Sequence, residues 1–133
     1  MSKQVLGFDV SALMDATKRP VWVPYSDEVK VAINHVTREK YAELVEEATT
    51  ISIDGRTNLR SETLDNLKLG ELIGLAAIAD WSGLVVGAEP FPCTPENIKV
   101  LMRKWSDFAR FVASHCNNLD RLMEIEKEAK KKN

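Results

Sequence analysis

The sequence predicts an α+β domain, mainly α, in which an N-terminal β-hairpin or small antiparallel sheet is followed by three to four helices. Two observations predict this class. The first sixty residues contain alternating β-branched side chains together with turn residues, whereas the second half carries apolar residues at helical spacing. The chain has 133 residues, enough for one domain, and we expect a single domain over 1–133. Within it we expect a β-rich part over 1–36, a helical part over 37–125 and a frayed polar tail over 126–133.

The hairpin is predicted from two alternating segments, Val21–Tyr25 and Val29–Ile33. Ser26 and Asp27 lie between them as turn residues. Pro24 has no backbone N–H to donate, so its strand should lie at an edge of the sheet or end there. Upstream, either a third strand or one or two helical turns fit residues 6–16.

The first helix is expected to begin at Thr37, a good N-cap residue, and to end near Thr49. Val36 and Tyr41 stand at the positions that form a hydrophobic staple around such a cap. Residues 51–55 are predicted to form a short strand that enters a turn.

The second helix is expected to run from Ser61 or Thr63 to Asp80. Its second half is apolar nearly all round, which is typical of a helix buried by several neighbours. Gly83 suits a left-handed C-terminal cap, and the stretch from there to Pro95 is predicted to be a loop.

The third helix has the strongest local signal. Thr94 is its N-cap, Pro95 occupies the first helical position and Glu96 meets the positive end of the helix dipole. An apolar stripe then continues past Asn117 and Asn118, so either one long helix or two with a break at the asparagines would fit. The stripe consists of Ile98, Leu101, Met102, Trp105, Phe108, Ala109, Val112, Cys116, Leu119, Leu122 and Met123.

A continuous helix from Ile98 to Met123 would span about 39 Å at 1.5 Å per residue, which is long for a small domain. We therefore expect part of its stripe to pack against a second copy of the chain.

Charge and cysteine content limit the classes of function. The chain carries 18 basic and 20 acidic residues, a net charge of −2, which argues against a nucleic-acid partner. Two cysteines are too few for a disulfide scaffold, and the N-terminal residues contain no apolar run of signal-peptide length, so we expect a cytoplasmic protein. The apolar window at 67–79 is too short to cross a membrane. Lys130, Lys131 and Lys132 are expected to be a solvated helix end.

Catalytic and metal-binding residue patterns are scarce. His115 and Cys116 are neighbours on a predicted helix and point about 100° apart, and no metal-ligand spacing supplies further ligands. Cys93 precedes a helix N-terminus, where a thiol pKa can fall, with His35 or His115 as a conceivable base. The simpler interpretation places Cys116 in the core and Cys93 in a packed loop. We expect no enzyme activity, cofactor or metal.

Glycines and tryptophans are assigned structural roles first. Gly70 and Gly74, four residues apart in a helix, are expected to permit close helix packing rather than to bind phosphate. Trp22 and Trp105 are expected in the core. Trp81, at a helix end before a Pro-rich loop, is the candidate for a half-exposed interaction anchor.

The segment Asp80-Trp81-Ser82-Gly83-Leu84, followed by residues 89–97 (EPFPCTPEN) and by residues 107–112 (DFARFV), resembles the small tail assembly chaperones of tailed bacteriophages and prophages. The resemblance covers residues 60–115. It implies a non-enzymatic protein of the bacterial host cytoplasm that binds the tape-measure protein, and possibly the tail-tube protein, until the tail tube assembles. The residues expected to line its binding surface are Trp81, Leu84, Phe91 and Phe111.

Two other classes fit a small α+β domain without an active site. One is a structural virion component, such as a head-tail connector or a minor tail protein. The other is a small regulatory domain that touches nucleic acid through the hairpin and the basic tail.

Overall fold

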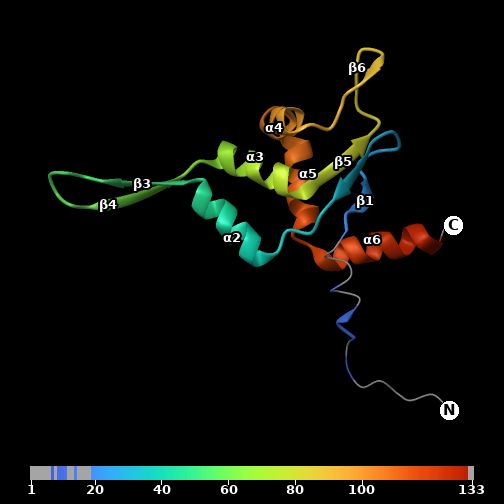
Figure 1. The fold of residues 1–133 in the computed structure, drawn as a ribbon, viewed down its shortest axis with the longest axis horizontal. Helices are drawn as coiled ribbons and strands as arrows, with labels where there is room; N and C mark the ends of the chain where they lie inside the picture. Colours follow the sequence, from blue (N-terminus) through green and yellow to red (C-terminus); the bar gives the residue numbers. More distant parts are fainter. Residues whose placement is uncertain (1–6, 8, 12–13, 15–18, 132–133) are drawn as a thin grey trace.

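The computed structural model describes residues 7, 9–11, 14 and 19–131. Within these residues five helices and three small antiparallel sheets form a mixed α+β fold that is mainly helical, and the predicted fold class is confirmed (Figure 1). The strand or helical turns expected over 6–16 lie largely outside the described residues.

The predicted N-terminal hairpin is present and forms two strands of a three-stranded sheet. Strands β1 (Val21–Pro24) and β2 (Lys30–Ile33) are antiparallel, and Tyr25 and Ser26 close the turn by donating to the Val29 carbonyl. The third strand, β5 (Ile78–Ser82), pairs with β2, so the order is β1-β2-β5 and β1 is an edge strand. Pro24 ends that edge strand, as its missing N–H requires.

The core lies between this sheet and the helices, all five of which contribute buried side chains. Helix α3 (Asn66–Ala77) packs against α4 (Pro95–Lys104) and α5 (Ser106–Cys116), and α6 (Leu119–Lys131) packs against β1. Two backbone bonds tie the segment after β2 to the helices: Asn34 N–H donates to the Ala77 carbonyl and Val36 N–H to the Cys116 carbonyl, both over 2.7 Å. The largest of the fully buried side chains are Phe108, Ile33, Leu122, Val23, Val31, Val112 and Cys116.

Helix α2 (Arg38–Glu47) begins where the sequence predicts. The Thr37 hydroxyl accepts from Lys40 N–H over 3.1 Å, and the last helical residue lies two before Thr49. Strand β3 (Thr49–Ile53) follows, in agreement with the expected strand before a turn. Its partner is β4 (Arg60–Leu64), and this hairpin projects from the body of the molecule (Figure 1).

The expected start and end of the second helix are wrong. Residues 60–64 form β4, and α3 begins one residue after Asp65, whose carboxylate accepts from Lys68 N–H as the N-cap. The helix ends at Ala77 because the next five residues pair with β2. The 37–125 part is therefore not only helical.

Gly83 follows a strand instead of capping a helix. Its φ of +90° is left-handed as expected, and a Cβ built there would overlap the backbone carbonyl of Glu28. The expected loop after it contains a minimal hairpin of β6 (Val85–Val86) and β7 (Glu89–Pro90).

The long apolar stripe is divided among three helices. The predicted cap of α4 is confirmed, with the Thr94 hydroxyl accepting from Asn97 N–H and with Pro95 in the first turn. The break at Asn117 and Asn118 is also present, but a second break occurs at Trp105, where φ and ψ are −112° and 86°. The expectation of a stripe spanning about 39 Å is therefore wrong, and most of its apolar residues enter this chain's own core.

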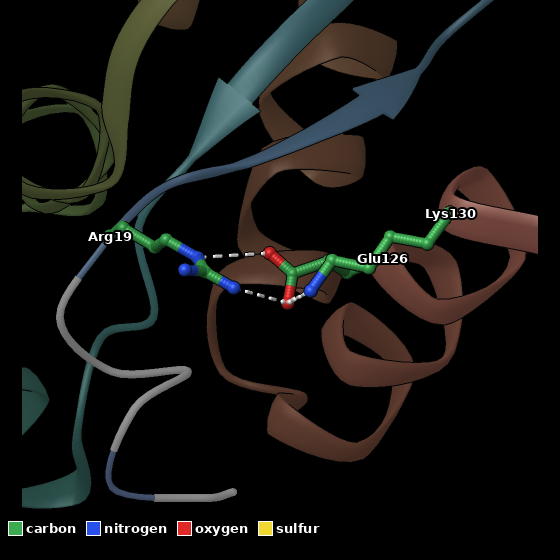
Figure 2. Close-up of polar contacts among 3 residues, drawn as sticks. All are labelled: Arg19, Glu126 and Lys130. Atoms are coloured by element: carbon green, nitrogen blue, oxygen red, sulfur yellow. Dashed lines mark hydrogen bonds and ion pairs between the residues drawn. The ribbon is translucent and has the colours of Figure 1, made fainter. Parts of the chain in front are cut away.

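The polar tail expected to fray is helical as far as Lys131 in α6. Ile125 is buried in the core and holds this helix against β1. The next residue of the helix, Glu126, is also contacted. Arg19 donates from Nε and Nη2 to its two carboxylate oxygens, each over 3.2 Å, and Lys130 Nζ lies 3.9 Å from the same carboxylate (Figure 2). The helix thus continues past residue 125, and the burial of Ile125 is the contact that anchors it against β1.

Candidate interaction site

Trp81 is buried, so the expectation that it is a half-exposed anchor is wrong. Its side chain is 6% exposed because it lies on β5, in register with Val31, instead of at a helix end. The indole Nε1–H donates to the Phe91 carbonyl over 2.6 Å, and the two rings stack with centroids 5.7 Å apart. Trp81 is therefore a structural residue.

Three of the four predicted surface residues do meet, but in a packed corner. Phe91 N–H donates to the Leu84 carbonyl over 2.8 Å, and both half-buried side chains pack against the core, with the Phe91 ring stacked on Trp81. Phe111 lies elsewhere, on α5, with its ring 4.9 Å from that of Tyr25. Phe108, fully buried, contacts both Trp81 and Tyr25 and so links the two groups.

Trp22 is the tryptophan that the structure leaves half exposed, and the expectation that it is a core residue is wrong. It is 45% exposed on the outer side of β1, where Val21 and Val23 take the inward positions. Alternation along a strand requires this result, because successive side chains point to opposite faces. The alternating pattern of valines was therefore the signal that could have identified Trp22.

A cleft of about 330 Å³ lies where Trp22 meets the C-terminal half of α6. Pro24 and Ile125 contribute apolar surface, and Lys30 and Glu128 supply one positive and one negative group. The last lining residue, Ala129, has a side chain too small to fill the space. The cleft thus offers a large aromatic surface flanked by charges of both signs, which suits an amphipathic partner.

Both thiols have pKa values above the ordinary value. Burial raises the pKa of the Cys93 thiol, and the negative charge of Asp80 raises it further. Burial raises the pKa of Cys116 to about 11. The helix N-terminus next to Cys93 therefore does not produce the lowered pKa that a reactive cysteine needs.

In both histidines Nδ1 is hydrogen-bonded to a backbone carbonyl. His35 Nδ1 lies 3.0 Å from the Cys116 carbonyl, and since a carbonyl only accepts, this nitrogen carries the proton. His115 Nδ1 likewise donates to the Phe111 carbonyl over 2.9 Å. The hydroxyl of Ser114 donates to the same carbonyl over 3.0 Å, and its oxygen lies 3.4 Å from His115 Nδ1.

A second cleft, of about 530 Å³, is lined by His35, Val36, Arg38, Tyr41 and Asn117, which include no carboxylate or thiol. Over 7, 9–11, 14 and 19–131, no group of three or more His, Cys, Asp or Glu residues could hold a metal ion. None of the described helices has the length and apolar character needed to cross a membrane.

Comparison with known proteins identifies no relative. No family model, curated protein or solved structure matches the chain. The Trp22 cleft is therefore assigned from its own geometry.

Proposed function

We propose that this chain is a non-enzymatic tail assembly chaperone of a tailed phage or prophage, acting in the bacterial host cytoplasm on the tape-measure protein. The observation that carries a binding role is the Trp22 cleft: a half-exposed indole beside α6, with Lys30 and Glu128 at its border. Tryptophan is the residue type most enriched at the centres of protein interfaces. The phage role rests on the sequence resemblance over residues 60–115.

A tape-measure protein is a long helical chain with extensive apolar surface, which would aggregate before the tail tube covers it. A chaperone for such a chain needs a shallow apolar site that accepts many similar helix faces and releases them. The Trp22 cleft has this character. An apolar side chain of the helix would rest on the indole, while its polar flanks would meet Lys30 and Glu128.

The residues that carry the resemblance are not assigned to the binding surface. Trp81, Leu84 and Phe91 form the packed corner that fixes the loop after β5 against the core. Their role is to stabilise the domain, and the exposed β1 and α6 surface is assigned to the partner.

The test is co-expression of the full chain with the tape-measure protein encoded beside it. We expect the chaperone to raise the soluble fraction of the tape-measure protein and to copurify with it. Trp22→Ala should abolish both effects. Tyr41→Ala is the matched control, because Tyr41 is also a partly exposed aromatic residue, at 38%, but lies on α2 outside the cleft.

Three outcomes would overturn this assignment. Equal solubilisation by wild type and Trp22→Ala would remove the cleft from the mechanism. Detection of the chain in purified virions by mass spectrometry would instead identify a structural component. Retention on DNA that falls steeply as salt rises would identify a regulatory nucleic-acid-binding domain.

A further inference from the structure

The β3–β4 hairpin leaves apolar side chains in solvent. Every residue of the two strands except Thr49 is exposed, and the hairpin extends away from the helices and the central sheet (Figure 1). Ile51 and Ile53 on β3 are 54% and 66% exposed. A two-stranded hairpin is only marginally stable by itself in water, so pairing with a further strand would stabilise it.

The hydrogen-bond pattern of the hairpin shows which backbone groups remain available. Asp54 N–H donates to the Leu59 carbonyl, and Asp65 N–H donates to the Ala48 carbonyl, each over 2.9 Å. Bonded pairs alternate with non-bonded pairs along an antiparallel ladder, so the even-numbered residues of β3 face β4. The N–H and C=O groups of Thr49, Ile51 and Ile53 therefore point away from β4, along the outer edge of this two-stranded sheet.

We propose that this edge pairs with the same edge of a second copy of the chain, antiparallel and centred on Ile51. In that register Ile51 of each copy exchanges both backbone hydrogen bonds with Ile51 of the other. Thr49 of each copy does the same with Ile53 of the other. The two hairpins then form one four-stranded sheet, and the apolar side chains of β3 lie side by side across the symmetry axis.

The composition of β3 favours self-pairing. Its five residues, Thr-Thr-Ile-Ser-Ile, contain no charge, proline or glycine, which are the features that usually protect an edge strand. The outer edge of β4 differs, because the equivalent pairing about its centre would place Glu62 directly opposite Glu62 of the second copy. The inference therefore selects β3 and excludes β4.

The two faces of the resulting sheet are chemically distinct. Residues opposite each other share a face, so Thr50 and Ser52 lie with Thr63 and Ser61 on a face of hydroxyls. Ile51, Ile53 and Leu64 lie on the other face, with Arg60 and Glu62. The same pairing continues both faces across the two copies without placing like charges opposite each other.

The experiment measures the mass of the full chain by light scattering and sedimentation over a range of concentrations. We expect a reversible dimer. Ile51→Pro removes an N–H that points away from β4, so it should weaken the dimer at least about tenfold while leaving the hairpin's own ladder intact. Glu62→Pro removes the equivalent outward N–H from β4 and should leave dimerisation unchanged.

A positive readout comes from cross-linking. Ile51→Cys places a thiol beside its symmetry mate and should give a reducible covalent dimer on mild oxidation, whereas Glu62→Cys should not. Circular dichroism of each variant checks that the helices are intact. A wild-type chain that is monomeric up to its solubility limit, or an Ile51→Pro variant that dimerises like Glu62→Pro, would overturn the proposal. Because both readouts are of oligomeric state, their result is independent of the chaperone role.

Discussion

Trp81 contacts Phe91 in two ways: its indole Nε1–H donates to the Phe91 backbone carbonyl over 2.6 Å, and the two rings stack at an interplanar angle of 5°. The bond spans the loop that contains β6 and β7. It fixes the approach to α4, whose cap lies three residues after Phe91.

Trp81→Phe should lower the free energy of unfolding by about 1 to 2 kcal/mol, because it removes the donor of this bond and leaves the Phe91 carbonyl without it. Urea unfolding should show a lower midpoint with an unchanged slope. Trp22→Phe is the control: Trp22 is 45% exposed, and its substitution should change stability by less than about 0.5 kcal/mol. Equal effects at the two positions would contradict the assignment of Trp81 to the core.

The sequence predicted elements whose signals are local. The caps at Thr37 and Thr94 act through a hydrogen bond to a residue three positions on, so their geometry is fixed within one turn. Strand β5 could not be predicted in this way. Its residues continue the helical periodicity of α3, and only the distant pairing with β2 makes them extended.

The break at Trp105 could not be predicted from the sequence for a different physical reason. Trp105 N–H donates to the Leu101 carbonyl, and Ala109 N–H donates to the Trp105 carbonyl, so four-residue spacing is kept on both sides of the break. A one-residue change of backbone direction therefore leaves the apolar period unaltered.

The structure buries Trp81 and exposes Trp22, the reverse of what the sequence predicts, because burial depends on which strand each tryptophan joins and on which face it lies.

Buried thiols make the stability of the protein fall at alkaline pH. Burial raises the pKa of Cys116 to about 11, so the folded state keeps its proton after the unfolded state has lost it. The unfolded state then binds fewer protons, and the free energy of unfolding decreases as pH rises from about 9 to 11. Denaturant unfolding at a series of pH values should show this slope, and Cys116→Ala should reduce it. An unchanged slope would assign the pH dependence to other groups.

The ion pair between Arg19 and Glu126 should contribute little to stability despite its two hydrogen bonds. Arg19 is 55% exposed and Glu126 is 24% exposed, so water and salt screen the charges. Glu126→Gln should cost no more than about 1 kcal/mol, and the cost should shrink at high salt. Glu128→Gln makes the same charge change two residues along α6 and controls for net charge. A large, salt-independent loss specific to Glu126→Gln would instead show that the contact is required for α6 to pack.

Two glycines of α3 should respond in opposite directions to the same substitution. A Cβ at Gly74 would lie 2.5 Å from Met102 Cγ and 2.9 Å from Ile98 Cγ2, so Gly74→Ala must push α3 and α4 apart and should cost about 1 kcal/mol or more. At Gly70 a Cβ would meet nothing within 4 Å, and Gly70→Ala should stabilise the helix by about 0.5 to 1 kcal/mol. The sequence predicted close packing at both positions, and the structure confirms it only at Gly74. Thermal unfolding of the two variants would separate these roles, since two glycines that both permit close packing would both lose stability.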